Sequence, residues 1–173
     1  MFPTSISLGH LLLITTFLLL IHCNFVKSDA QLIEKTCKQT PYYGSCVSFL
    51  KSRPESFKTD VDGLALIMVG IVEAKSKATQ SLIRVQLKKS PGLKRPLSFC
   101  ADEYDAILTA DIPEAKEALE KGNPKFAQDG MRDAANASDQ CEVNFHGGSP
   151  LSGLNKVVHV SSSIAAAIVQ LLL

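Results

Sequence analysis

Few side chains in this sequence have the types and spacing that enzymatic chemistry requires. Beyond residue 30, histidine occurs only at His146 and His159, and neither fits a metal-binding spacing or a nucleophile–base pair. Neighbouring carboxylates such as Glu114 and Glu117 lie among lysines, and nothing marks them as a catalytic acid and base. The sequence also has no glycine-rich phosphate loop and no Gly-x-Ser-x-Gly motif. We therefore expect a protein that is not an enzyme and that needs no metal ion or cofactor.

One short segment, residues 121–126 (Lys-Gly-Asn-Pro-Lys-Phe), joins two strongly periodic stretches and is typical of a turn between helices. Gly122 can end one helix in a left-handed conformation, and Pro124 suits the first position of the next. Asn123 is the predicted N-cap of that second helix, with its side-chain oxygen accepting a hydrogen bond from a backbone N–H group.

Lys125 and Phe126 then occupy the second and third positions of the helix, where other residue types are preferred. The helix dipole disfavours a cation there by about 0.3–1 kcal/mol, and a capping box would place Glu or Gln where Phe126 stands. Departures from local rules tend to lie at functional sites, so these two residues are candidates for binding a partner. The alternative is that Phe126 packs into the core and Lys125 is solvated.

An apolar run, residues 11–21, lies near the start of the chain. It is too short to span a bilayer, which needs about 20 residues, and a small-x-small site follows it at Ser28-Asp29-Ala30. This arrangement is typical of a secretory signal peptide. We predict that residues 1–30 are cleaved and that residues 31–173 form one secreted domain without a membrane anchor.

The charge balance of the chain is close to neutral, with a formal net charge of +1 and no run of like charges. This balance gives no indication of nucleic acid or of an anionic membrane surface as a partner. The segment Asn136-Ala137-Ser138 is a glycosylation motif, so Asn136 is a candidate N-glycosylation site in the secretory pathway.

Residues 31–57 are expected to form a short helical hairpin that carries two of the four remaining cysteines. The first helix covers residues 31–38, and the second starts with Thr40 as cap and Pro41 at its first position. The hairpin brings Cys37 towards Cys46, so we pair these two out of the three connectivities that four cysteines allow. Cys100 and Cys141 then form the second disulfide, from inward-facing positions of consecutive helices.

Four longer stretches carry the periodicity of α-helices. The first, residues 60–89, is capped by Asp60 or Asp62 and stops at residues 90–92. Its predicted core face follows alternating steps of four and three through Leu64, Met68, Ile71, Lys75, Ala78, Leu82 and Val85.

The second stretch runs from near Pro96 to Lys121, with a kink or short break near Asp111 because Pro113 interrupts the pattern. The third follows the turn, and the small residues on its inner face predict a close approach to its neighbours. The fourth begins near Leu151, after Ser149 as cap and Pro150 at the first position. The sequence therefore predicts an all-α fold: an antiparallel up-and-down four-helix bundle (58–173) with an N-terminal helical hairpin (31–57).

This pattern resembles the plant invertase and pectin methylesterase inhibitor family over essentially all of residues 31–173. The resemblance depends on the four cysteines, on residues 64–68 (Leu-Ala-Leu-Ile-Met) and on Glu142 after Cys141. The invertase-inhibitor branch is marked by a Pro-Lys-Phe tripeptide at the helix-to-helix turn, and here it stands as Pro124-Lys125-Phe126. Residues 107–110 and 113–115 are also similar to that branch.

The resemblance implies a secreted, monomeric inhibitor of a plant acid invertase (β-fructofuranosidase), located in the apoplast or cell wall, with the vacuole as the alternative. In that branch the tripeptide enters the cleft of the enzyme and competes with sucrose. Lys125 would pair with carboxylates of the enzyme, Phe126 would fill the sugar pocket, and Pro124 would hold the turn rigid.

Two alternatives remain open at the level of sequence. One is a pectin methylesterase inhibitor, which has the same bundle but uses helix faces to cover its target. The other is a bundle that carries a hydrophobic ligand, because the small residues between Ala127 and Cys141 could leave a cavity.

Overall fold

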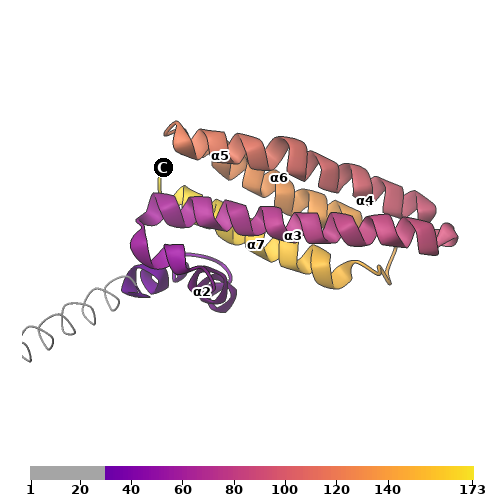
Figure 1. The fold of residues 1–173 in the computed structure, drawn as a ribbon, viewed down its shortest axis with the longest axis horizontal. Helices are drawn as coiled ribbons and strands as arrows, with labels where there is room; N and C mark the ends of the chain where they lie inside the picture. The colour runs from indigo at the N-terminus through magenta and orange to yellow at the C-terminus, as the bar shows by residue number, and fades with distance from the viewer. Residues whose placement is uncertain (1–29) are drawn as a thin grey trace, which may run out of the picture.

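The computed structural model describes residues 30–173, which fold as a bundle of long helices with a helical hairpin packed at one end (Figure 1). The hairpin consists of a helix over residues 30–37 and helix α2 (Tyr43–Lys51), followed by a 3₁₀ turn, η1 (Pro54–Lys58). The described residues contain no β-strand. Apart from residue 30, the predicted signal peptide lies outside the described residues.

Four helical rods form the bundle. Helix α3 (Val61–Lys89) is the first rod, and the 3₁₀ turn η2 (Pro91–Leu93) leads into the second. The second rod is α4 (Lys94–Ala106), a π-helical turn η3 (Ile107–Asp111) and α5 (Ile112–Glu120) in one continuous path. Helices α6 (Pro124–Val143) and α7 (Ser152–Gln170) complete the up-and-down arrangement, which confirms the predicted fold class.

The two disulfide bonds have the predicted pairing. The Cys37–Cys46 bond closes the hairpin, and the Cys100–Cys141 bond joins α4 to α6. All four cysteines are fully buried. The buried Tyr104 hydroxyl also donates a 2.8 Å hydrogen bond to Oδ1 of Asn155, which ties α4 to α7.

The start of α2 differs from the prediction. This helix begins at Tyr43, and Thr40 and Pro41 lie in the preceding turn. The Thr40 hydroxyl donates a 2.8 Å hydrogen bond back to the carbonyl oxygen of Cys37. Thr40 therefore satisfies the end of the first helix and does not cap the second.

Helix α3 starts as predicted, because the Asp60 side chain accepts a 3.0 Å hydrogen bond from the Gly63 N–H group. Its predicted core face is correct for Leu64, Met68 and Ile71, and Leu82 packs partly buried against the core, but Ala78 and Val85 do not belong to that face. A strict seven-residue pattern drifts by about 20° per heptad from a straight α-helix, so the buried face moves sideways. Ala78 and Val85 are exposed, and the buried residues in this half of the helix are Ser76, Thr79 and Ile83.

The predicted irregularity near Asp111 is a π-helical turn, η3, that lets the second rod continue past Pro113. The start of this rod is earlier than predicted, at Lys94, so Pro96 lies in the first helical turn, where proline is tolerated.

The fourth rod starts within one residue of the predicted Leu151, but Pro150 is not its first helical residue. Helix α7 begins at Ser152, because the Ser149 hydroxyl accepts a hydrogen bond from the Leu151 N–H group and Pro150 remains in the turn. Within residues 30–173, no helix combines the length and the apolar character needed to cross a membrane.

Candidate functional site

The turn between α5 and α6 lies at the same end of the bundle as the C-terminus and the start of α3 (Figure 1). Gly122 has a φ of 71°, in the left-handed region, as the sequence predicts. The N–H groups of Gly122 and Asn123 donate hydrogen bonds of 3.2 Å and 2.8 Å to the carbonyls of Leu119 and Ala118. This is a Schellman motif, which fixes the direction in which the chain leaves α5.

Asn123 occupies the N-cap position of α6, but its side chain makes no capping hydrogen bond, so that part of the prediction is wrong. The N–H group of Phe126 donates instead to the backbone carbonyl of Asn123, at 3.2 Å. Pro124 is the first residue of α6, as predicted. Its fixed φ and the Schellman motif together restrict the turn from both sides.

Phe126 projects from the first turn of α6 with 57% of its surface exposed, so the alternative in which it packs into the core is wrong. Its ring borders a surface depression of about 310 Å³ on the α5 side of the turn. The depression is lined by Glu114, Glu117, Ala118, Lys121, Asn123 and Phe126. An aromatic ring placed at the rim of a surface depression is available to a partner.

Lys125 is also exposed, and its ammonium group forms an ion pair with Asp129 one helical turn further along α6. The Nζ–Oδ1 distance is 2.6 Å, and the Lys125 side chain is 58% exposed. On the other side of the turn, Lys121, the C-cap residue of α5, pairs with Glu117 in the same way. This contact lowers the pKa of Glu117, chiefly through the hydrogen bond from Lys121. Each lysine at the turn is therefore held by an acidic residue of its own helix.

The start of α6 is held firmly against the rest of the bundle. A Cβ atom at Gly130 would lie 2.9 Å from the carbonyl oxygen of Asp111, so the two backbones approach more closely than any other residue would allow. Nε2 of the buried Gln128 donates a 2.6 Å hydrogen bond to Oε1 of Gln170 near the end of α7. The predicted close approach of this helix is confirmed.

Asp111, the π-turn residue beside Gly130, has a pKa raised to about 6. Burial is the main cause, and the carboxylates of Asp133, Glu114 and Glu103 add to it. This acidic group belongs to the support of α6 and lies beside Gly130, which is about one helical turn beyond Phe126.

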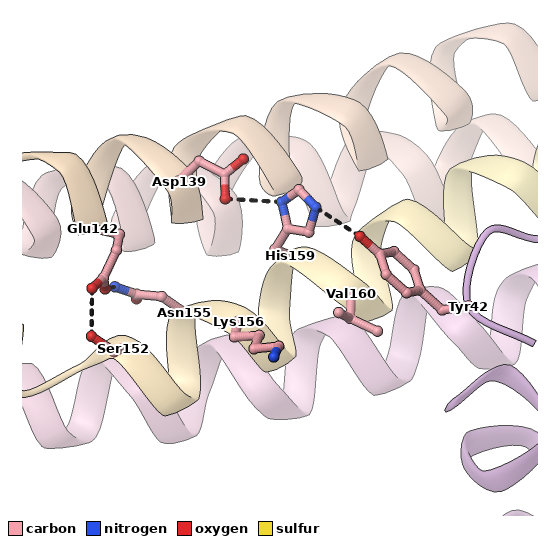
Figure 2. A pocket seen from close by; sticks show the side chains of 8 residues that line it. All are labelled: Tyr42, Asp139, Glu142, Ser152, Asn155, Lys156, His159 and Val160. Carbon is pink, nitrogen blue, oxygen red and sulfur yellow. Dashed lines mark hydrogen bonds and ion pairs between the residues drawn. The ribbon is translucent and has the colours of Figure 1, made fainter. Parts of the chain in front are cut away.

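A second depression, of about 370 Å³, lies between the hairpin, α6 and α7 (Figure 2). His159 stands between two partners there: its Nδ1 lies 2.9 Å from Asp139 Oδ1, and its Nε2 lies 3.4 Å from the Tyr42 hydroxyl. These contacts join α7 to α6 and to the hairpin. They give His159 a structural role in the described fold.

The same depression contains a polar cluster that the sequence pattern does not reveal. The Glu142 carboxylate accepts a 2.7 Å hydrogen bond from Asn155 Nδ2 and a second bond from the Ser152 hydroxyl (Figure 2). Asn155 is buried, but it lies outside the apolar positions that mark the core face of its helix. The sequence pattern therefore does not distinguish it from a polar residue on the surface. Among the described residues, no group of His, Cys, Asp and Glu is placed to hold a metal ion.

Asn136 lies in the middle of α6 and is exposed to solvent. Its exposure is compatible with an attached glycan, and its glycosylation stays a prediction.

Comparison with known proteins provides evidence that the geometry alone does not contain. A family model described as plant invertase/pectin methylesterase inhibitor matches residues 31–168. The Arabidopsis thaliana protein named cell wall/vacuolar inhibitor of fructosidase 1 is 43% identical over 141 residues, which cover 82% of this chain and 69% of that protein. Inhibitor of fructosidase 2 from the same plant is 40% identical over 109 residues.

These alignments differ in how much of each relative they include. The chain spans 59% of the length of the second inhibitor of fructosidase. A third relative, pectinesterase inhibitor 2 of Arabidopsis thaliana, is 23% identical over 117 residues, which cover 66% of it.

Two solved structures are similar to the bundle. A crystal structure of a mutant form of a pectin methylesterase inhibitor from Arabidopsis aligns with a TM-score of 0.68 and 20% identity, covering 78% of this chain and 92% of that one. A crystal structure of a pectin methylesterase inhibitor from Arabidopsis thaliana aligns with a TM-score of 0.61, also at 20% identity, covering 82% and 95%. At this identity the likeness shows the fold alone.

Proposed function

The chain belongs to the plant invertase/pectin methylesterase inhibitor family, and from this premise we propose that its target is a plant acid invertase, or β-fructofuranosidase. The protein is an enzyme inhibitor and not an enzyme. The proposed binding element is the tripeptide Pro124-Lys125-Phe126, which enters the sucrose-binding cleft of the target.

The observation that carries this proposal is the exposure of Phe126 beside Lys125 on a turn that hydrogen bonds hold in place. Buried aromatic anchors carry much of the binding energy at protein interfaces, and a charge that is paired in a desolvated site can add to it. Both lie in the first turn of α6, so a single narrow projection presents them together. A projection of this kind suits a cleft better than a flat surface.

The chemistry of the proposed target matches a lysine. Retaining glycoside hydrolases work with two carboxyl groups about 5 Å apart. The Lys125 ammonium group can donate hydrogen bonds to these carboxylates, and such charge-assisted bonds are stronger than the pair with Asp129 once solvent is excluded. The unfavourable position of a cation near the N-terminus of α6 then has a function in the complex.

Phe126 and Pro124 have different proposed roles. The Phe126 ring fills the pocket that otherwise takes a sugar ring, and burying it in the complex removes apolar surface from water. Pro124 limits the conformations of the turn, so little entropy is lost when it docks. The close backbone contact at Gly130 supports the same rigid presentation.

A pectin methylesterase inhibitor is the rival function within the family. The higher identity to the two inhibitors of fructosidase, 43% and 40% against 23% for the pectinesterase inhibitor, favours invertase as the target. A direct test titrates the purified, oxidised protein against an acid invertase and a pectin methylesterase in parallel. We expect invertase alone to lose activity. Inhibition of the methylesterase alone would show that the target is a pectin methylesterase and not an invertase.

The proposed setting follows from the same relatives. Two of them carry names that place them in the cell wall or vacuole, and we propose the cell wall as the location, with the vacuole as the alternative. We propose further that the inhibitor acts as a monomer, since one turn makes the whole proposed contact. Sedimentation equilibrium of the free protein tests that state.

A further inference from the structure

Asp129 lies between two cations along one face of α6. Its Oδ1 atom is 2.6 Å from Nζ of Lys125 and 3.9 Å from Nη1 of Arg132. We propose that Asp129 is a positioning residue. It holds Lys125 through an ion pair in the free inhibitor, and it pairs with Arg132 when Lys125 enters the cleft of the target. This inference rests on the proposed function, in which Lys125 is a binding residue.

The pair between Lys125 and Asp129 is suited to being broken. The two side chains are 58% and 47% exposed, so solvent weakens their attraction. The lysine also precedes the acid along the helix, which is the less favourable order for a pair four residues apart. A desolvated pair of carboxylates in a cleft therefore attracts Lys125 more strongly than Asp129 does.

Release of Lys125 alone would leave a carboxylate without a partner beside an acidic cleft. Like charges brought together at an interface oppose binding. Arg132 removes this obstacle, since its guanidinium group is already 3.9 Å from the same oxygen atom and its side chain is 55% exposed. The face of α6 then keeps its charge balance through the whole docking step.

Asp129 also sets the starting position of Lys125. While the ion pair persists, the ammonium group is drawn along α6, away from the tip of the turn, and its charge is partly cancelled. Replacing Asp129 by asparagine frees the ammonium group and raises the net positive charge of the turn. Association with an acidic cleft should then be faster, and the effect should fade with added salt.

The variants separate this role from a general effect of charge. Asp129→Asn should tighten binding about twofold at low salt, the size expected for losing one exposed pair. Asp133→Asn is the matched control, because Asp133 is an exposed aspartate on the same helix and the substitution changes the net charge equally. Asp129→Glu should behave like the wild type, since a glutamate can still reach Lys125.

Arg132→Gln should weaken binding about twofold, and this loss should vanish when Asp129 is asparagine.

The experiment measures association rates and dissociation constants for the complex with purified acid invertase at low and high salt, together with the thermal stability of each variant. The key comparison repeats Asp129→Asn in the Lys125→Ala background, where we expect no gain beyond that of Asp133→Asn. A gain from Asp129→Asn that equals the control, or a loss, overturns the inference while the proposed function stands. If the wild type does not inhibit invertase, or Lys125→Ala inhibits equally well, the proposed function and this inference fall together.

Discussion

The carbonyl oxygen of Asp111 lies 2.9 Å from the place that a Cβ atom at Gly130 would occupy. This contact joins the π-helical turn of the second rod to the first half of α6, where Gly130 lies about one helical turn beyond Phe126. The absence of a side chain at Gly130 thus lets α6 approach a backbone oxygen atom directly. The position of the α5–α6 turn, which carries the tripeptide, depends on this approach.

Gly130→Ala should destabilise the protein although alanine favours helices. The added methyl group meets a backbone atom that cannot rotate away, so one rod must move, and we expect a loss of about 1–2 kcal/mol. Thermal unfolding measures the change. Gly70→Ala in α3 is the control, because nothing lies within 4 Å of its added Cβ, and it should stabilise by up to about 1 kcal/mol. Equal stability of Gly130→Ala and wild type would contradict the close contact.

Lys125→Ala should weaken invertase inhibition by about 30-fold or more, because a desolvated charge pair with the enzyme is lost. Its stability should change by less than about 0.5 kcal/mol, since only an exposed pair is removed. Lys77→Ala removes a similarly exposed lysine that pairs with Glu73 on α3, and it serves as the control. The inhibition constants of the wild type, Lys125→Ala and Lys77→Ala against invertase measure the difference. A loss of similar size in both variants would point to net charge as the cause.

Phe126→Ala should reduce affinity by about 10- to 30-fold with little effect on folding, because the ring is already more than half exposed in the free protein. Val143 provides a matched control: it is exposed at the opposite end of α6, and Val143→Ala should leave inhibition unchanged. Isothermal titration with invertase gives both affinities. If truncation of Phe126 costs less than threefold, the ring is not an anchor.

The stability of the protein should depend on pH through Asp111. Burial raises the pKa of this carboxyl group to about 6, above its usual value in an unfolded chain. Ionised Asp111 therefore destabilises the fold at pH 7. This penalty begins to shrink as the pH falls below about 6, and it is lost only near the ordinary pKa of an aspartate, at about 4. Asp111→Asn should raise the stability by about 1 kcal/mol at pH 7.5, allowing for solvent screening, and should have little effect at pH 4.

Thermal unfolding at the two pH values checks this sign, with Asp105→Asn as the control because Asp105 is exposed on α4. The difference between variant and wild type isolates Asp111 from the other carboxylates. A gain of the same size at both pH values would show that the effect of the substitution does not come from ionisation.

The helices and disulfides were predictable because their signals are local or topological. The spacing of Leu64, Met68 and Ile71 requires a helix with one buried face, and a hairpin places Cys37 beside Cys46. The left-handed Gly122 and the position of Pro124 follow from backbone preferences that hold in any context.

The errors arose where two local solutions compete or where tertiary packing decides. The Phe126 N–H group had two oxygen atoms of Asn123 within reach, and the backbone oxygen accepts it. Thr40 could cap either of two helices, and it bonds to the first. Burial of Ser76 and Thr79 reflects the path of α3 across the bundle, which apolar spacing alone does not reveal. The exposure of Phe126 likewise depends on the turn lying at the end of the bundle.

The most direct test of insertion into the cleft is the dependence of inhibition on sucrose. Initial rates of a purified acid invertase are measured over a range of sucrose and inhibitor concentrations, with Lys125→Ala alongside the wild type. We predict that the apparent inhibition constant of the wild type rises linearly with the sucrose concentration while the maximal rate is unchanged. An apparent inhibition constant that does not vary with sucrose would contradict occupation of the sucrose site by Pro124-Lys125-Phe126.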